Sequence, residues 1–434
     1  MKIGIFSDRY LPLSDGICTS IETFRLELEK LGHEVYVFAP KPSWRFKAPS
    51  DRIIFFTAIK GLFFDDYLTS FFFPPQALKQ IDQLKLDIIH YQTPGPIGLL
   101  GAYYALRKKI PLVTTYHTDL FEYVKHYPAV LPGTIGLSLL APVITGGNMD
   151  EYRNALSSIR PERNVDKWNQ KIVVRGLTLI HNHCDLVITP SIKIQKQLAS
   201  WGTKSKLEVL PTGVDKITTT SQEIEIVRAK YGLSVSDHVL IFVGRIGTEK
   251  NIGLLIKAFD HIGRQDDLAK LLIIGDGDDV AQFKEQAATS QYGNRIIFTG
   301  WIQHEQLGAY YDSACLFVSA SLTETQGLST NEAAWAGLPI VIVDPEVSEV
   351  VADGENGFIA KVSARDLASK ILKILKNDVL RSNMSTRSVE YAGNFTAGKQ
   401  AAKLLRLYEA TIEKHTKDQS TKKRPSRREL AASK

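Results

Sequence analysis

Short apolar segments rich in β-branched residues alternate with amphipathic helical segments along almost the whole chain of 434 residues. Most of the apolar segments lack polar alternation, which is typical of strands that are buried on both faces of a parallel sheet. Repetition of strand, helix and strand predicts doubly wound α/β sheets. The expected strands form two series, residues 2–7, 34–39, 87–91, 112–116, 186–190 and 207–210, then residues 238–243, 270–274, 295–299, 316–319 and 339–343.

The two series are separated near residues 211–213, and a polar stretch follows. A chain of this length exceeds one ordinary hydrophobic core. We therefore expect two Rossmann-like domains, residues 1–212 and 213–395. Their sheets are expected to face each other across a cleft, because ligands of such sheets bind outside the carboxyl ends of the strands. An amphipathic helix over residues 396–414 is expected to complete the first domain, and residues 415–434 to form a basic, disordered tail.

Charge and cysteine content narrow the classes of function. Three widely spaced cysteines, without a Cys-x-x-Cys motif, argue against a disulfide scaffold or a zinc site and fit a reducing cytoplasm. The net charge is +6, but residues 411–434 contain eight Lys/Arg and three Asp/Glu and so contribute +5. The nearly neutral remainder argues against nucleic acid as a partner. The tail either binds anionic lipid headgroups or is a solvated terminus.

A pair of cations follows one of the expected strands. The segment VGRIGTEKN, residues 243–251, places Arg245 and Lys250 five positions apart between a strand and a helix. Two cations at the carboxyl end of a strand, close to a helix N-terminus, suit a diphosphate. Taken alone, such a pair is also typical of solvated surface charges.

A second segment, SLTETQGLSTNEAA at residues 321–334, runs from a strand through a glycine turn into an Ala/Leu-rich helix. Backbone N–H groups of residues 326–328 would point at an anion at the positive end of this helix. Glu324 in the turn and Glu332 in the helix can then accept hydrogen bonds from sugar or ribose hydroxyls. The alternative is that Glu324 caps the helix and Glu332 is an ordinary surface residue.

Together the two segments resemble the retaining GT-B glycosyltransferases of family 4. The donor domain of that family carries a Gly-Arg-x4-Lys segment, matched here by Gly244, Arg245 and Lys250, and a Glu-x7-Glu segment, matched by Glu324 and Glu332. The resemblance implies the GT-B fold, with the acceptor bound by the first domain and a nucleotide-sugar donor by the second.

Two segments of the first domain extend the likeness, which covers the chain up to about residue 416. FSDRYLP at residues 6–12, followed by Asp15 and Gly16, resembles the family's first loop, although Asp15 stands where the commonest pattern has a glycine. YHTD at residues 116–119 resembles the active-site histidine segment.

The resemblance implies a role for each matched residue. Arg245 and Lys250 would bind the diphosphate and neutralise the charge of the leaving group, and Glu332 would hold the ribose hydroxyls. Glu324 would orient the donor sugar and its proximal phosphate, and His117 would lie beside the transferred sugar. The remaining predicted donor contacts are Gly16, Gly244, Ile302, Thr325, Gln326, Gly327 and Leu328.

The implied chemistry needs fixed positive charge. Breaking the anomeric bond releases a nucleoside diphosphate, and two cations with a helix dipole would stabilise that anion. The family retains the anomeric configuration, by attack from the face that the phosphate leaves. No metal and no other cofactor is expected. Asp65-Asp66 is interpreted as structural or acceptor-side rather than as a metal site.

Two features point to a lipid acceptor. TETQG at residues 323–327 and YHTD with the later Tyr123 and His126-Tyr127 resemble the subgroup that glucosylates diacylglycerol, which implies transfer of glucose from UDP-glucose to 1,2-diacylglycerol. In addition, WRFK at residues 44–47 precedes the apolar runs at 53–56, 62–64 and 71–75. Such aromatic and basic runs suit the surface of an anionic membrane. The alternative is that these phenylalanines are core residues.

Two other functions are compatible with the sequence. One is a family-4 mannosyl- or galactosyltransferase acting on another lipid or on a cell-envelope polysaccharide, and the other is a non-catalytic sugar-nucleotide-binding protein. Residues 128–173 form a segment that is longer than usual in the subgroup, and the sequence does not explain it. No apolar run predicts a spanning helix, so we expect a cytoplasmic enzyme, peripherally associated with the inner face of the cell membrane.

Overall fold

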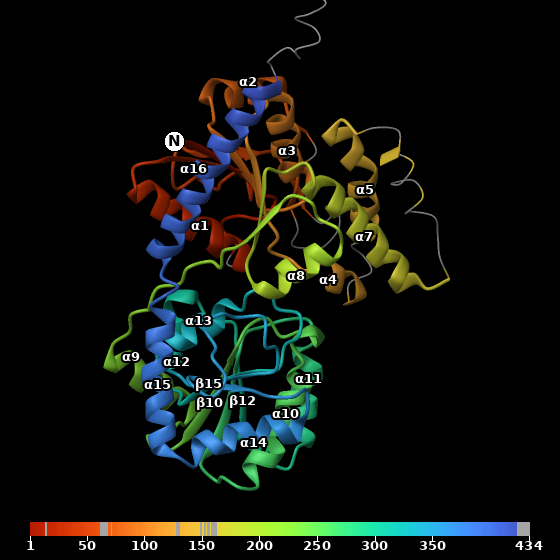
Figure 1. Cartoon of the computed structure of the whole chain (residues 1–434). Helices are drawn as coiled ribbons and strands as arrows, with labels where there is room; N and C mark the ends of the chain where they lie inside the picture. The colour runs from red at the N-terminus through yellow and green to blue at the C-terminus, as the bar shows by residue number, and fades with distance from the viewer. Residues whose placement is uncertain are drawn as a thin grey trace, which may run out of the picture. The chain divides into compact units, whose positions relative to one another are not determined.

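The computed structural model divides the chain into two compact units (Figure 1). Unit 1 comprises Met1–Leu210 together with Gln400–Lys434, and unit 2 comprises Pro211–Lys399. The structure describes residues 1–422 apart from 14, 61–67, 71, 127–130, 148–149, 152, 154–156 and 158–162.

Unit 1 is built on a seven-stranded parallel sheet with the strand order β3-β2-β1-β6-β7-β8-β9. Its strands are β1 (Lys2–Phe6), β2 (Glu34–Pro40), β3 (Ile53–Phe56), β6 (Ile88–Tyr91), β7 (Leu112–Thr115), β8 (Leu186–Thr189) and β9 (Lys206–Val209). A separate antiparallel pair is formed by β4 (Ile59–Lys60) and β5 (Leu68–Thr69).

Helices cover both faces of this sheet. Those that the structure describes in unit 1 are α1 (Gly16–Lys30), α2 (Pro75–Leu84), α3 (Pro96–Lys108), α4 (Leu120–His126), α5 (Leu131–Thr145), α7 (Val165–His181), α8 (Ile192–Ser200) and α16 (Ala397–Lys422). Ile88 of β6 packs in one core cluster with residues of α1 and α16, whereas Ile89 packs in another with residues of α3 and α7. Burial on both faces is therefore the reason that the strands read as continuous apolar runs.

Strand β3 was not among the strands expected from the sequence. Its residues Ile53–Phe56 pair in parallel with β2, and Ile53 and Phe56 are buried. Phe73 packs its ring against Phe56 at 5.1 Å between centroids. This part of the supposed interfacial run is therefore core, which was the stated alternative. Residues 62–64, Phe71, and Asp65-Asp66 lie outside the described residues.

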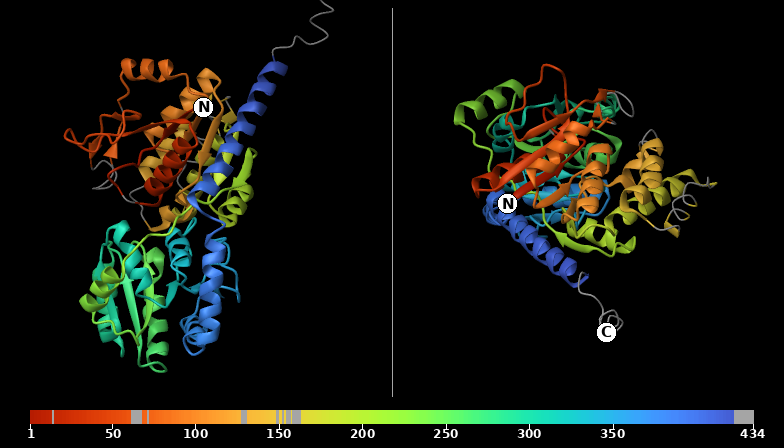
Figure 2. Two further views of the ribbon diagram at one scale, coloured as in Figure 1. Left: turned by 90° about the vertical axis from the view of Figure 1, so that its left-hand side faces the viewer. Right: turned by 90° about the horizontal axis from the view of Figure 1, so that it is seen from above.

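The last helix, α16, packs on unit 1 (Figure 2). Leu404 and Tyr408 join the core cluster of Ile3 and Ile5, and the Tyr408 hydroxyl lies 2.6 Å from His90 Nδ1. The helix continues to Lys422, eight residues beyond the end expected from the sequence. Contacts to unit 1 accompany this extension, because His415 Nδ1 lies 2.9 Å from Asp185 and the Gln419 amide donates to a backbone carbonyl.

Unit 2 is a six-stranded parallel sheet with the order β12-β11-β10-β13-β14-β15. The strands are β10 (His238–Val243), β11 (Ala269–Ile274), β12 (Ile296–Gly300), β13 (Leu316–Ser319), β14 (Ile340–Ile342) and β15 (Gly357–Ile359). The helices are α9 (Ser221–Tyr231), α10 (Ile252–Gly263), α11 (Val280–Thr289), α12 (Leu307–Asp312), α13 (Leu328–Trp335), α14 (Ala364–Leu375) and α15 (Asp378–Ala392).

The strand orders place a topological switch point in each sheet. In unit 2 the chain runs outward from β10 to β12 on one side and from β13 to β15 on the other, so the crevice opens between β10 and β13. In unit 1 the corresponding neighbours are β1 and β6. The expected fold class is confirmed, since both units are α/β with parallel sheets.

Candidate functional site

The first candidate loop of unit 2 follows β10, at the switch point of the sheet. It carries Arg245 and then a short 3-10 helix, Thr248–Lys250, before α10 begins. Two glycines after β11 allow this loop to pack closely. A Cβ atom on Gly275 would lie 1.9 Å from the carbonyl oxygen of Gly244, and one on Gly277 would lie 2.2 Å from that of Ile246. The backbone that carries the first cation is therefore fixed by glycine-only contacts.

Both predicted cations form ion pairs within unit 2. Arg245 Nη2 lies 2.6 Å from Glu249 Oε1, and the Arg245 side chain remains 43% exposed. Lys250 Nζ lies 2.5 Å from Glu324 Oε1, with both side chains largely buried. The structure thus brings together Lys250 and Glu324, which are 74 residues apart. The pair places a positive and a negative group side by side at the carboxyl edge of β10 and β13.

The second candidate loop follows β13 and leads into α13. Gly327 precedes the helix with φ +73°, a left-handed conformation that favours glycine. The Thr323 hydroxyl donates to the backbone carbonyl of Glu249 at 3.2 Å and so ties this loop to the first one. The side-chain amide of Gln326 exchanges two hydrogen bonds of 2.8 Å with the backbone of Thr212. The Gln326 side chain is therefore occupied within unit 2, and only its backbone N–H corresponds to the expected donor contact.

Glu332 lies in α13 and is almost completely buried. The Tyr311 hydroxyl donates to Glu332 Oε2 at 2.7 Å, and His304 Nε2 lies 2.9 Å from Glu332 Oε1. The alternative of a plain surface residue is therefore wrong for Glu332, because its side chain is only 7% exposed. The hydrogen bond to Glu332 raises the pKa of His304 above its ordinary value, against the effect of burial.

The predicted donor contact Ile302 lies in the segment that follows β12. Gly300 has φ +78° and its carbonyl accepts a hydrogen bond from Gly275 N at 3.1 Å, which joins this segment to the loop after β11. Trp301 is 59% exposed, whereas Ile302 packs against the core of unit 2. An inward Ile302 side chain leaves the backbone of this segment as its polar surface.

In unit 1, His117 follows β7 and is held by a residue after the neighbouring strand. Its Nε2 atom lies 2.5 Å from Gln92 Oε1, which follows β6. Burial lowers the pKa of His117 to about 4, with Asp15 acting in the opposite direction, so the imidazole is neutral at physiological pH. Because a neutral imidazole can donate to an amide oxygen only from a protonated nitrogen, this contact assigns the proton to Nε2.

A small cavity adjoins His117. It has a volume of about 20 Å³, room for roughly one water molecule, and Gln92, Tyr116 and His181 are among its lining residues. His181 Nδ1 is buried and has no hydrogen-bond partner within the described residues. Burial lowers the pKa of His181 to about 4. His181 is the last residue of α7, a helix that begins at Val165 inside the unexplained segment 128–173 and ends beyond it.

The structure gives a reason for Asp15 in the first loop of unit 1, where the commonest family pattern has a glycine. Asp15 caps α1 by accepting hydrogen bonds from the N–H groups of Ile17 and Cys18, at 3.0 and 2.9 Å. Its other oxygen accepts from Arg9 Nε at 2.5 Å. Gly16 is the first residue of α1. A glycine at position 15 would supply neither of these contacts, so Asp15 contributes a helix cap here.

Three residues that position site groups were not found from the sequence: Gln92, His304 and Tyr311. Each reaches its partner across a crossover connection, and the separations are 25, 28 and 21 residues. No spacing rule for one helix or one loop covers such distances. The strand order is the signal that places them, because residues after neighbouring parallel strands meet at one edge.

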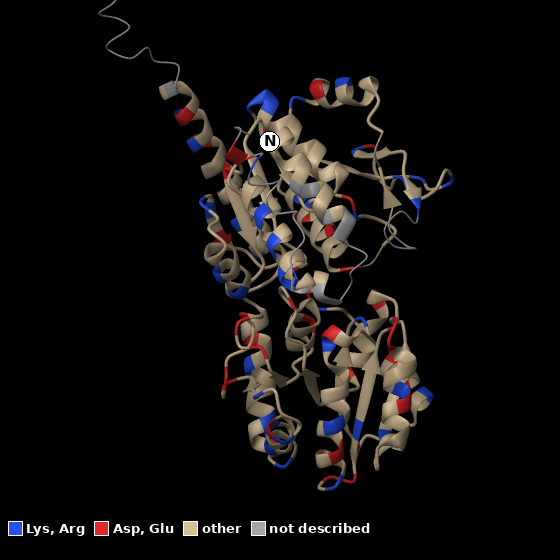
Figure 3. Ribbon diagram, turned by 90° about the vertical axis from the view of Figure 1, so that its right-hand side faces the viewer, with Lys and Arg blue, Asp and Glu red and all other residues tan. Residues whose placement is uncertain are grey.

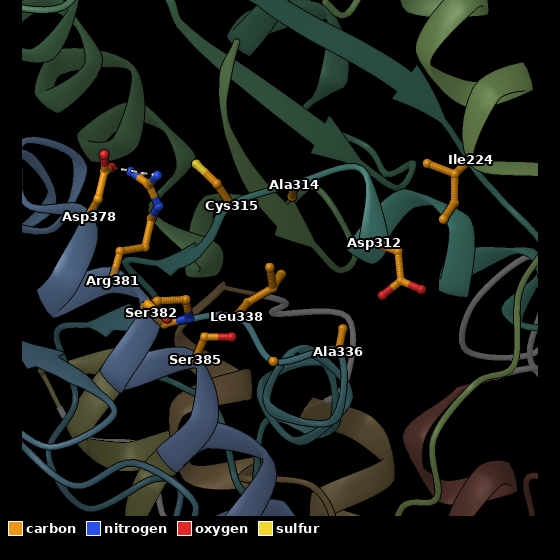
Figure 4. A pocket seen from close by; sticks show the side chains of 12 residues that line it. Ile224, Asp312, Ala314, Cys315, Ala336, Leu338, Asp378, Arg381, Ser382 and Ser385 are labelled. Atoms are coloured by element: carbon orange, nitrogen blue, oxygen red, sulfur yellow. Dashed lines mark ion pairs between the residues drawn. The ribbon is translucent and has the colours of Figure 1, made fainter. Parts of the chain in front are cut away.

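A larger hollow in unit 2 lies at the opposite edge of the sheet (Figure 4). It has a volume of about 590 Å³, and Asp312, Cys315, Arg381 and Ser385 are among its lining residues. Cys315 immediately precedes β13, so this hollow adjoins the amino ends of the strands rather than the donor loops. Arg381 is paired there with Asp378 at 2.7 Å.

The chain matches two family models. Residues 14–216 match Glycosyltransferase Family 4, and residues 223–391 match Glycosyl transferases group 1. The alpha-monoglucosyldiacylglycerol synthase of Streptococcus pneumoniae is 32% identical, over 86% of this chain and 78% of that protein. The enzyme of the same name from Acholeplasma laidlawii is 29% identical, over 96% of this chain and 99% of that protein.

Solved structures give the fold. The sucrose-phosphate synthase of Thermosynechococcus elongatus superposes with a TM-score of 0.69 at 18% identity, covering 95% of this chain and 99% of that one. Anabaena HepE, determined in complex with UDP and glucose, gives 0.67 at 16% identity, covering 94% and 100%. The sheets, the family models and the relatives agree, and the chain belongs to glycosyltransferase family 4 as a hexosyltransferase with the GT-B fold.

Proposed function

We propose that this enzyme transfers glucose from UDP-glucose to the hydroxyl of 1,2-diacylglycerol at a membrane surface, with retention of configuration. The observation that carries the donor half is the contact of Lys250 with Glu324 at the switch point of unit 2. The two synthases that match over most of the chain support the acceptor half through their printed activity.

The donor's diphosphate is assigned to Arg245, Lys250 and the N-terminus of α13. Arg245 keeps an exposed guanidinium, which supplies paired N–H donors suited to phosphate oxygens. The backbone of Thr325, Gly327 and Leu328 leads into the positive end of α13. Fixed charge of this kind stabilises the nucleoside diphosphate as it leaves. Transfer is therefore expected to persist when divalent cations are removed with EDTA.

Glu324 and His117 are assigned to the sugar. Lys250 contacts Oε1 of Glu324, and this ion pair fixes the orientation of the whole carboxylate. The positive charge of Lys250 also balances the negative charge of Glu324. His117 is neutral through burial and therefore serves as a hydrogen-bonding group rather than as a cation. Gln92 fixes its ring through Nε2.

The acceptor side is assigned to unit 1. Helix α5 contains no charged residue along LPGTIGLSLLAPVIT, yet Leu140 and Val143 are 51% and 56% exposed. Lys167 and Arg175 are exposed on α7, which packs against α5, and they stand two turns apart. Apolar and cationic side chains on adjacent helices suit an anionic bilayer surface.

A second exposed group remains from the aromatic and basic runs. Trp44 is 79% exposed with Arg45 stacked 4.5 Å from its ring centroid, and Phe72 is 69% exposed. Within the described residues no helix is long and apolar enough to cross a bilayer. Figure 3 shows basic and acidic residues interspersed over the described helices. We propose peripheral association through these local surfaces at the inner face of the cell membrane.

The test combines donor and acceptor choice. The purified chain is incubated with UDP-glucose, UDP-galactose or GDP-mannose and with vesicles that contain either diacylglycerol or a diacyl lipid without a free hydroxyl. Glucosyldiacylglycerol in the α configuration is expected from UDP-glucose with diacylglycerol alone. A different sugar in the product would correct the donor, and donor turnover without any glycolipid would correct the acceptor.

A matched pair of variants tests the diphosphate assignment in the same assay. Arg245→Ala is expected to reduce kcat/KM by about 10² to 10³, the range for loss of one preorganised charge-stabilising group. Arg264→Ala, an exposed arginine at the end of α10 on the same unit, is expected to keep normal turnover. Equal activity of the two variants would remove Arg245 from the donor site.

A further inference from the structure

The partners of Glu332 use half of the hydrogen-bonding capacity of its carboxylate. A carboxylate has two oxygens with about four lone-pair positions. Tyr311 takes one position on Oε2, and His304 takes one on Oε1. One position therefore remains on each oxygen. Two acceptor positions on adjacent oxygens match a pair of vicinal hydroxyls, such as those of a ribose.

We propose that Tyr311 and His304 are positioning residues for the donor's ribose, holding the Glu332 carboxylate so that both of its oxygens accept the 2′- and 3′-hydroxyls. This inference rests on the proposed nucleotide-sugar donor. The family resemblance already implies the ribose role of Glu332, and the inference adds the two residues that orient its carboxylate: His304 before α12 and Tyr311 in α12.

Burial gives the Tyr311 contact its strength. Tyr311 is only 1% exposed, and its hydroxyl lies 2.7 Å from the carboxylate of Glu332, whose side chain is 7% exposed. Burial raises the pKa of Tyr311 well above its ordinary value, so the hydroxyl keeps its proton and remains a donor. Hydrogen bonds to a charged, desolvated acceptor are stronger than neutral ones and more directional. Without this bond the carboxylate would lose the contact that fixes the orientation of Oε2.

His304 adds a charge that depends on pH. Its side chain is 43% exposed and faces Glu332 of α13, with Glu305 adjacent and Tyr311 neutral. The raised pKa means that the imidazolium persists to higher pH than in a free histidine. While His304 is protonated the pair with Glu332 has no net charge, and when it loses its proton the pair becomes anionic. A nucleoside diphosphate is itself anionic, so its affinity is expected to fall as pH rises through this pKa.

Nucleotides with and without ribose hydroxyls distinguish a role of Tyr311 in positioning Glu332 from a general role in folding. Isothermal titration of the full chain compares UDP with 2′,3′-dideoxy-UDP, and GDP with 2′,3′-dideoxy-GDP. Both pairs are used because uridine and guanosine nucleotides carry the same ribose. Tyr311→Phe is expected to weaken the hydroxyl-bearing nucleotide by about tenfold. The dideoxy nucleotide should change by less than about twofold. Tyr310→Phe, the preceding buried tyrosine of α12, is the matched control and should leave both affinities unchanged.

His304 gives a second, independent measurement at the protein surface. As pH rises through the raised pKa of His304, affinity of the wild-type chain for the hydroxyl-bearing nucleotide should fall by about three- to tenfold. His304→Gln keeps a neutral N–H donor. Its affinity for the hydroxyl-bearing nucleotide should not change with pH and should equal the affinity of the wild-type chain at high pH. Equal weakening of ribose and dideoxy nucleotides by Tyr311→Phe, or a wild-type pH profile in His304→Gln, would overturn the inference. A wild-type chain that binds none of the four nucleotides would instead overturn the proposed donor.

Discussion

Unit 2 and unit 1 hold their candidate site residues by different physical means. In unit 2, Lys250 and Glu324 pair directly, each in the loop that follows one of two neighbouring strands. In unit 1, His117 is fixed by an uncharged amide and by burial that lowers its pKa. Unit 2 therefore presents fixed charge at its donor loops, suited to a diphosphate, whereas the histidine of unit 1 is buried and neutral. Charged residues show in a sequence motif, but the burial of a single polar side chain such as His117 does not.

The histidines show the same contrast. In unit 1, burial lowers the pKa of His90 to about 3 and those of His117 and His181 to about 4. In unit 2, the carboxylate of Glu332 raises the pKa of His304. The same side chain is thus kept neutral in one unit and stabilised as a cation in the other.

The largest expected effect tests the charged character of unit 2. Lys250→Ala removes one of two proposed diphosphate cations and also leaves Glu324 without its buried partner. We expect kcat/KM to fall by about 10³, because a preorganised charge acts on the leaving group in the transition state. Steady-state transfer with the proposed donor measures this loss. Lys257→Ala on α10, an exposed lysine of the same unit, is the control.

Lys250→Ala removes both the lysine charge and the ion pair with Glu324, and Glu324→Gln distinguishes these two contributions. It removes the ion pair but keeps Lys250, so a smaller loss than in Lys250→Ala is expected if the lysine acts on phosphate. An equal loss in the two variants would contradict a separate action of Lys250 on the phosphate.

The next effect tests the neutral character of unit 1 through its acid sensitivity. The folded pKa values of His90, His117 and His181 lie below the ordinary value of 6.5, so below that pH the unfolded chain binds more protons. Stability is therefore lost as pH falls from about 6.5 toward about 4, by up to about 1.4 kcal/mol per pH unit for each histidine. Burial raises the pKa of Asp8, which offsets part of this loss near the acid end.

Urea unfolding at several pH values measures this slope, and hydrogen exchange assigns it to a unit. His181→Phe is the informative variant, because the buried Nδ1 atom has no partner within the described residues and Phe preserves the ring that packs edge-on against Tyr116. It should reduce the acid slope while keeping transfer activity. Protection in unit 2 that collapses at the same pH as in unit 1 would contradict the comparison.

Much of the fold could be predicted because burial on both faces leaves a simple pattern. The expected strands at 238–243 and 316–319 coincide with β10 and β13. Strand β15, Gly357–Ile359, was missed since three residues carry too little pattern, and β3 was missed because its phenylalanines also suit a membrane surface. Short strands are defined by the neighbour that they pair with, which a single chain segment does not reveal.

The candidate site divides along the same line. Lys250 and Glu324 are matched by spacings within single loops, so the sequence pointed to both. Tyr311 and His304 carry no such spacing, because their contact with Glu332 depends on how the connection after β12 packs beside α13. Asp15 was noticed as a departure, but its use as the cap of α1 required the backbone conformation.

The smallest expected effect concerns the apolar surface of unit 1. Leu140→Glu with Val143→Glu introduces two charges on the exposed side of α5, a helix that otherwise has none. If α5 contacts lipid, flotation with anionic vesicles should weaken by about fivefold or more, since the apolar surface lost from the bilayer is small and desolvating a carboxylate adds to the cost. Val235→Glu on unit 2, at an 89% exposed valine, controls for added charge. Transfer to a detergent-dispersed acceptor should change little in the α5 variant, because its donor loops are intact. Unchanged flotation would show that α5 is not the lipid contact and would leave Trp44 and Phe72 as the candidate contact of unit 1.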